Sequence, residues 1–165
     1  EFFKTQEGKT VYVVGLSFGA FIVQELIAAN DVADGYLIIA GRLDLEADSW
    51  QQVSQGNFTG YEDDDDGNFT IIVLDEESNS TERNMARLAA GFGFNRYTDK
   101  LNSVPSLSTV TYVYANRDDQ LGPLSTEEIQ FLDDKGANLI LSDGGNHDDA
   151  SLTGLFIIKQ TFGIQ

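Results

Sequence analysis

The chain has 165 residues, 41% of them hydrophobic, which is enough for one ordinary globular domain. Asp and Glu number 27 against 10 Lys and Arg, giving a net charge of −17. Nucleic acids and anionic membranes bind basic surfaces, so this charge argues against both as partners. The absence of cysteine excludes disulfide bonds and thiolate metal sites. No apolar run is long enough to span a bilayer, and the start shows no signal-peptide pattern.

The first part of the chain predicts a strand, a helix and a second strand. Residues 1–9 look like the end of a helix, and residues 11–14 form an apolar, β-branched run typical of a strand buried on both faces. Residues 18–29 carry apolar side chains at helical spacing, and residues 36–40 form another apolar strand. Short links between these elements predict parallel strands joined by a right-handed crossover.

A polar stretch, residues 45–104, then interrupts the alternation. It contains the acidic run 62–66, a strand-like segment at 70–74 and a helix-like segment at 81–90. No core-sized apolar pattern supports independent folding of this stretch. We therefore expect an insertion within a single domain that spans residues 1–165.

The alternation of strands and helices resumes after the insertion. Residues 109–114 are rich in β-branched and aromatic side chains, and residues 125–128 form a capping box that opens a helix. A strand at 138–141, a glycine-rich loop at 143–149 and a closing helix at 151–160 follow. This order predicts an α/β fold, with a parallel sheet and helices on both faces.

A candidate nucleophile lies where the first strand passes into its helix, in the pentapeptide Gly-Leu-Ser-Phe-Gly at residues 15–19. At such a junction the glycines leave room for a sharp, strained turn that exposes the hydroxyl of Ser17. The backbone N–H of Phe18, at the start of the helix, is then placed to hold an oxyanion. The alternative is a structural turn in which Ser17 only caps the helix.

The candidate base and acid follow later strands. His147, the single histidine, lies in the loop after the last strand, and Asp118 and Asp119 both follow the strand at 109–114. Because loops after parallel strands emerge at one edge of a sheet, these side chains are expected near Ser17. His147 is the candidate general base, and an aspartate would orient its imidazole.

These motifs resemble the α/β-hydrolase superfamily, in the C-terminal half of its fold from the nucleophile elbow onward. Residues 14–20 (VGLSFGA) match the family's elbow, and residues 117–124 (RDDQLGPL) match its acid loop. In the family the segment that corresponds to the insertion commonly forms a lid. The resemblance covers most of the chain outside that insertion.

The resemblance also assigns the triad. In the family's pattern the acid stands four residues before the proline, which favours Asp119 over Asp118. The chain order Ser17, Asp119, His147 is the order of the family. A rarer variant of the family carries the acid after the preceding strand, where Asp44 stands.

The resemblance implies a serine hydrolase of the carboxylesterase kind, acting on a small carboxylic ester or related acyl substrate. Ser17 would attack, the Phe18 amide would hold part of the oxyanion, and no metal or organic cofactor is implied. The alternative function is a catalytically inactive chain that kept the fold as a binding or assembly module.

Further strands precede the elbow in a full α/β-hydrolase, so the resemblance implies that this chain is truncated at its N-terminus. The strand at 11–15 would then be an open, apolar sheet edge, which invites pairing. We expect this edge to pair with an N-terminal segment or with a second copy of the chain. The absent part also carries the second oxyanion N–H, so the isolated chain is expected to turn over slowly.

Overall fold

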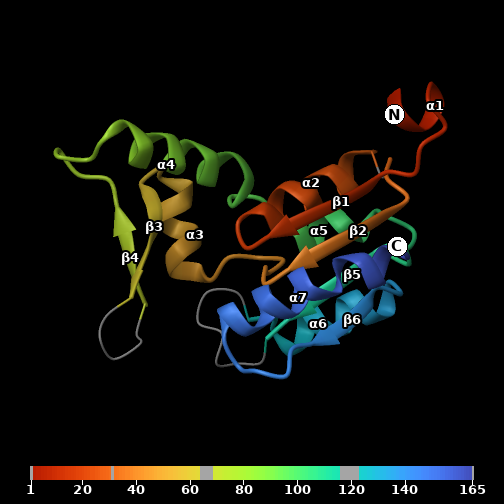
Figure 1. Ribbon diagram of the computed structural model, residues 1–165. Coiled ribbons are helices and arrows are strands. Elements are labelled where there is room, and N and C mark those ends of the chain that lie inside the picture. The colour runs from red at the N-terminus through yellow and green to blue at the C-terminus, as the bar shows by residue number, and fades with distance from the viewer. Residues whose placement is uncertain (1, 31, 64–68, 116–122, 165) are drawn as a thin grey trace. The chain divides into compact units, whose positions relative to one another are not determined.

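The computed structural model describes residues 2–30, 32–63, 69–115 and 123–164 (Figure 1). The chain forms two compact units, which are Glu1–Leu43 with Tyr97–Gln165, and Asp44–Arg96. None of the described helices is long and apolar enough to cross a membrane.

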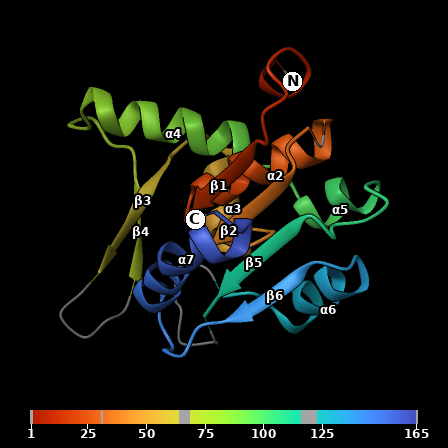
Figure 2. The same ribbon diagram turned by 45° about the vertical axis from the view of Figure 1, so that its right-hand side comes forward.

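A parallel sheet forms the centre of the first unit. Its strands are β1 (Tyr12–Leu16), β2 (Gly35–Ile39), β5 (Val110–Tyr114) and β6 (Asn138–Leu141). They lie in the order β1-β2-β5-β6, and each pairs in parallel with its neighbour (Figure 2). All four strands therefore end at the same edge of the sheet.

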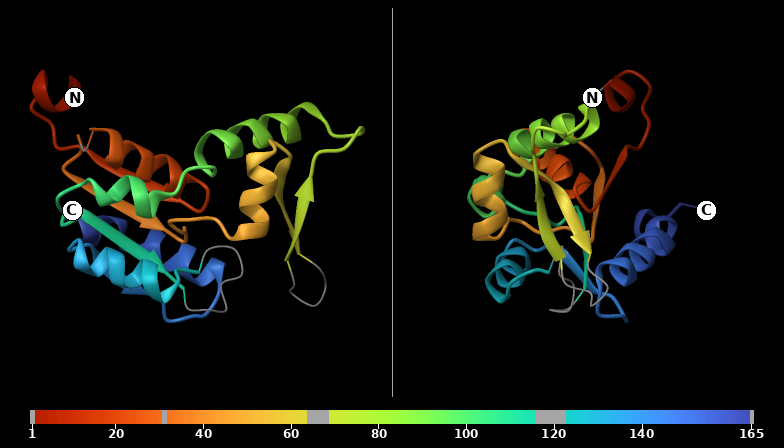
Figure 3. Two further views of the ribbon diagram at one scale, coloured as in Figure 1. Left: turned by 180° about the vertical axis from the view of Figure 1, so that it is seen from behind. Right: turned by 90° about the vertical axis from the view of Figure 1, so that its left-hand side faces the viewer.

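Helices cover both faces of this sheet (Figure 3). One face carries α2 (Gly19–Asn30), α5 (Tyr97–Asn102) and α6 (Thr126–Asp134), while α7 (His147–Phe162) covers the other. The core under α7 is an apolar cluster made of Leu37, Ile39, Ala40, Val113, Ala115 and Ala150. This arrangement confirms the predicted α/β fold with helices on both faces.

The start of α7 differs from the prediction. The sequence suggested a loop over 143–149 and a helix from Ser151, whereas α7 begins at His147. The reason is a capping box between Asn146 and Asp149, which satisfies free backbone N–H groups of the first helical turn. The predicted capping box at the start of α6, between Ser125 and Glu128, is confirmed.

In the described sheet β1 is an edge strand. Its side chains Val14 and Leu16 are 41% and 39% exposed, whereas every residue of β2 is buried. The prediction that residues 11–14 form a strand buried on both faces is therefore wrong, because Val14 is exposed and residues 11–13 are only partly buried. On the α7 side of the sheet, the ring of Tyr12 stacks on Phe162 at 4.3 Å.

The loop before β2 fastens the N-terminal end of β1. Asp34 accepts a hydrogen bond from the backbone N–H of Val11 (2.8 Å) and forms an ion pair with Lys4 (2.9 Å). The hydrogen bond from Lys4, and after it the one from Val11, holds the pKa of Asp34 below its ordinary value. Because Lys4 belongs to α1 (Phe2–Thr5), this carboxylate ties the first helix to the sheet.

The second unit consists of helices packed on a β-hairpin. α3 (Ala47–Ser54) precedes β3 (Phe58–Asp63), which pairs antiparallel with β4 (Phe69–Val73), and α4 (Ser80–Phe92) follows. The elements β4 and α4 were predicted from the sequence, but α3 and β3 were not.

Side chains hold the two ends of the second unit together. Arg96 donates a hydrogen bond to the carbonyl of Leu45 (2.8 Å), and its guanidinium lies 5.1 Å from the centre of the Trp50 ring. Trp50 in turn stacks on Phe94 and donates from its indole N–H to the Phe94 carbonyl (3.0 Å). These contacts therefore join the first and the last residues of the second unit to each other.

The predicted insertion, residues 45–104, extends beyond the second unit because it includes α5. That helix belongs to the first unit, where Tyr97 is fully buried and its ring stacks on Phe21 of α2 at 5.7 Å. The Tyr97 hydroxyl also donates to the carboxylate of Glu25 (3.2 Å).

Candidate active site

Ser17 lies on the turn between the last residue of β1 and the first residue of α2. Its φ is +54°, in the left-handed region that non-glycine residues seldom adopt. The backbone fixes this conformation from both sides, because the Ser17 N–H donates to the Ile39 carbonyl (2.8 Å) and the Ser17 carbonyl accepts from Ala20 (2.9 Å). A serine that only capped the helix would have extended backbone, so this geometry favours an exposed nucleophile.

Close packing around the turn requires glycine at two positions. A Cβ at Gly15 would lie 2.5 Å from the carbonyl oxygen of Gly19 and 2.6 Å from a methyl carbon of Val23. A Cβ at Gly41, just after β2, would overlap the side chain of Ala20. At Gly19, by contrast, a Cβ would meet no described atom within 4 Å. The expectation that both glycines of the pentapeptide make room therefore holds for Gly15 alone.

The backbone strain at Ser17 predicts a difference in stability between two variants at this position. Ser17→Gly is expected to be more stable than Ser17→Ala by about 0.5–1 kcal/mol, because glycine tolerates positive φ. This figure is what remains of the relieved strain, about 1–2 kcal/mol, after the larger entropy loss of glycine on folding. Urea denaturation followed by far-UV circular dichroism measures the difference. Equal or reversed stabilities of the two variants would show that the turn is not strained.

His147 is brought to Ser17 by the start of α7. Its ring nitrogen Nε2 lies 3.1 Å from Oγ of Ser17, although 130 positions separate the two residues in the sequence. This distance is within hydrogen-bond reach, which a general base needs in order to take the proton of an alcohol. Both residues belong to the first unit, and both are partly buried. The structure thus brings together two of the side chains that the sequence marked as candidates, Ser17 and His147.

The backbone N–H of Phe18 is the candidate oxyanion donor. Phe18 follows Ser17 and precedes the first residue of α2. Among the residues that the structure describes, no group accepts a hydrogen bond from this N–H. This amide is therefore a candidate donor of the kind that an oxyanion hole requires.

The structure does not place any of the three candidate acids beside His147 among the residues of the first unit that it describes. Asp118 and Asp119 lie outside the described residues, and Asp44 is the first residue of the second unit. The described flanks of the acid loop, Ala115 and Leu124, are both buried in the first unit. Since β5 runs in the same direction as β1, the C-terminal end of β5 lies at the edge of the sheet that carries Ser17.

Two buried polar side chains near the turn were missed from the sequence. Gln24 of α2 is fully buried and donates to the carbonyl of Arg42 (3.0 Å), and the carboxylate of Glu128 accepts from the N–H of Leu43 (3.1 Å). Both bonds fix the segment that follows β2, against which the nucleophile turn packs. The predicted capping box placed Glu128 in the first turn of a helix, but no local pattern indicated its hydrogen bond with the N–H of Leu43.

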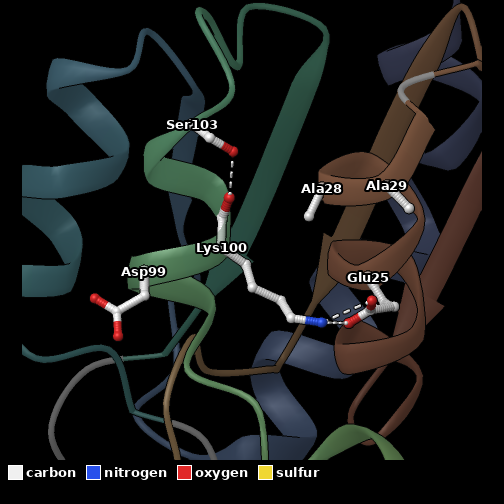
Figure 4. Close-up of a pocket in the computed structure, with 6 residues that line it drawn as sticks. All are labelled: Glu25, Ala28, Ala29, Asp99, Lys100 and Ser103. Carbon is white, nitrogen blue, oxygen red and sulfur yellow. Dashed lines mark hydrogen bonds and ion pairs between the residues drawn. The ribbon is translucent and has the colours of Figure 1, made fainter.

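A pocket of about 260 Å³ lies elsewhere in the first unit, between α2 and α5 (Figure 4). Lys100 extends across it and binds both carboxylate oxygens of Glu25, at 2.6 and 2.7 Å. The hydroxyl of Ser103 donates to the Lys100 carbonyl (3.0 Å). These groups bind one another and fasten α5 to α2, and neither Ser17 nor His147 lines the pocket. In the described part of the chain, no three His, Asp or Glu side chains are grouped so as to hold a metal ion.

Comparison with known proteins identifies the fold. No protein-family model matches the sequence, and neither does any curated protein. The solved structures that are similar to the chain include two α/β-hydrolases. MGS-M2, an α/β-hydrolase enzyme from a Medee basin deep-sea metagenome library, is 13% identical, with a TM-score of 0.59 over 94% of this chain and 64% of that one. The peroxisomal α/β-hydrolase Lpx1 from Saccharomyces cerevisiae is 11% identical, with a TM-score of 0.56 over 98% of this chain and 57% of that one.

The chain therefore has an α/β-hydrolase fold, as its motifs suggested. It spans less than two thirds of the length of each of these two proteins. At identities this low, the likeness concerns the fold and carries no activity with it.

Proposed function

We propose that the chain is a serine hydrolase that cleaves a carboxylic ester or a related acyl compound. The observation that carries the proposal is the contact of 3.1 Å between Ser17 Oγ and His147 Nε2. The left-handed backbone of Ser17 supports it further, as does the N–H of Phe18, which donates to no group among the described residues. Together these are the nucleophile, the base and one oxyanion donor of an acyl-transfer site.

In the proposed reaction, Oγ of Ser17 bonds to the carbonyl carbon of the substrate while His147 takes the proton of the Ser17 hydroxyl. The carbonyl oxygen becomes an oxyanion, which accepts a hydrogen bond from Phe18 N–H. The C–O bond to the leaving alcohol then breaks, and the alcohol takes its proton from His147. Water attacks the acyl-enzyme with His147 again as base, releases the carboxylic acid and restores Ser17.

The proposal needs an acid that holds the imidazole in the reactive tautomer. We assign this role to Asp119, with Asp118 and Asp44 as the alternatives. Asparagine substitutions at the three positions distinguish the candidates. Turnover should fall by several orders of magnitude only in the variant whose substituted aspartate is the acid of the triad. Within this proposal, residues 45–104 are the lid-like insertion.

Covalent labelling tests the function. A fluorophosphonate probe reacts with activated serines, so it should label the wild-type chain and fail to label Ser17→Ala. A folded wild-type protein that resists the probe would instead favour the alternative, a binding or assembly module without catalysis.

The proposal includes a partner for the edge strand. β1 presents apolar, partly exposed side chains at Val14 and Leu16, and an unpaired strand edge of this kind invites another strand. A full site also needs a second oxyanion N–H, whose loss lowers turnover by about 10²–10³-fold. We propose that an N-terminal segment or a second copy of the chain occupies this edge.

For the 165-residue chain by itself, the expected result is self-association, because a second copy is then the one available partner. Light scattering coupled to gel filtration should give a mass of about twice 18.1 kDa. A well-behaved monomer of 18.1 kDa would contradict the pairing of β1 between copies.

A further inference from the structure

The first turn of α7 holds His147 between the two members of a capping box. The side chain of Asn146 accepts from the N–H of Asp149 (2.9 Å), and the carboxylate of Asp149 accepts from the N–H of Asn146 (3.3 Å). His147 is the first helical residue, so its backbone lies inside this closed pair of bonds. The hydroxyl of Ser151 adds a bond to the His147 carbonyl (2.8 Å).

The capping box is itself seated on the preceding loop. The side chain of Asp149 lies so close to Gly144 that a Cβ at that position would overlap it. The Gly144 carbonyl accepts from the hydroxyl of Ser142 (2.8 Å), and Ser142 is only 5% exposed at the end of β6. A chain of contacts therefore runs from the sheet through Ser142, Gly144 and Asp149 to the backbone of Asn146, the residue before His147.

These contacts matter because the base must stay within hydrogen-bond reach of Oγ. The segment before His147 contains two adjacent glycines, and glycine is the most flexible residue of the backbone. Without its cap, the first turn of α7 has free N–H groups and frays. A displacement of about 1 Å at a reacting group can lower a rate about 10²-fold.

We propose that the capping box of Asn146 and Asp149, supported by Gly144, positions His147 for proton transfer with Ser17. The inference rests on the proposed function, and it adds two positioning residues that touch no reacting atom. It also explains why position 144 is a glycine, because a Cβ there would overlap the carboxylate of Asp149.

The chain offers a matched control for this inference. At the start of α4, Asn79 forms the same kind of capping box with Glu82, accepting from the N–H groups of Thr81 (2.8 Å) and Glu82 (3.2 Å). α4 belongs to the second unit and carries neither Ser17 nor His147. Asn79→Ala removes an asparagine cap as Asn146→Ala does, but leaves the base untouched.

The test compares the rate of fluorophosphonate labelling of Ser17 in the full chain. Asn146→Ala is expected to lower this rate about 10–100-fold, whereas Asn79→Ala leaves it unchanged. Asn146→Ser, which keeps a good N-cap without adding charge, should restore the rate to within a few fold of wild type. Equal rates for Asn146→Ala and Asn79→Ala would overturn the inference.

A second measurement separates this inference from the proposed function. His147 is the single histidine, so its imidazole protons give isolated NMR signals. Asn146→Ala should shift or broaden them and Asn79→Ala should not, whether or not the chain is an active enzyme. Unlabelled wild-type protein would refute the function, while unchanged imidazole signals in Asn146→Ala would refute the positioning.

Discussion

Replacement of Ser17 by alanine is expected to lower hydrolysis of a 4-nitrophenyl ester by about 10³–10⁶-fold, down to the rate in buffer. The substitution removes the one atom that bonds to the acyl carbon in the proposed reaction, and the remaining amide of Phe18 stabilises an oxyanion only if a nucleophile attacks. Initial rates at saturating ester measure the loss.

The fold serves as the control for this loss. Alanine at position 17 keeps the left-handed backbone and its strain, so the denaturation midpoint of Ser17→Ala should stay close to that of wild type. Ester hydrolysis that persists in a folded Ser17→Ala protein would show that another group is the nucleophile.

Replacement of His147 by glutamine is expected to cause a loss of similar size, about 10³–10⁶-fold. Glutamine preserves a polar side chain of comparable length but does not take up a proton, so the hydroxyl of Ser17 loses its base. Rates of hydrolysis and of fluorophosphonate labelling should fall together, because both need the activated serine.

The double variant makes the second prediction sharper. Residues that act as one unit lose their activity together, so Ser17→Ala combined with His147→Gln should be no slower than Ser17→Ala alone. If the two losses multiplied, the residues would contribute independently, and the contact of 3.1 Å would not be the catalytic pair.

Much of the first unit could be predicted from local sequence patterns. The strands are apolar, β-branched runs of four to six residues, and the elbow is visible because a glycine-flanked serine falls where a strand passes into a helix. His147 could be placed near Ser17 by topology alone, since loops after parallel strands share one edge. The distance of 3.1 Å between the two side chains could not be predicted, because it depends on how the folded chain places the start of α7 against the turn after β1.

Two features of the first unit were not predicted from the sequence, which are the start of α7 and the assignment of α5. The acidic, glycine-rich stretch before Ser151 looks like a loop, and only the reciprocal bonds of Asn146 and Asp149 start the helix at His147. α5 is short and follows a polar stretch, so its assignment to the first unit depends on the burial of Tyr97 against α2. No local pattern indicates such a contact.

The second unit illustrates the same limit. α3 has few apolar residues, and its place depends on Trp50, whose partners Phe94 and Arg96 lie more than forty positions further along. In contrast, α4 was visible from its helix-forming composition, and β4 from its β-branched residues.

The central claim is that Ser17 is a nucleophile activated by His147, and mapping a covalent adduct tests it most directly. Wild-type protein treated with a fluorophosphonate probe, digested and analysed by mass spectrometry should carry the probe on Ser17, and His147→Gln should carry almost none. An adduct on another serine, or equal labelling of Ser17 in both proteins, would contradict the account.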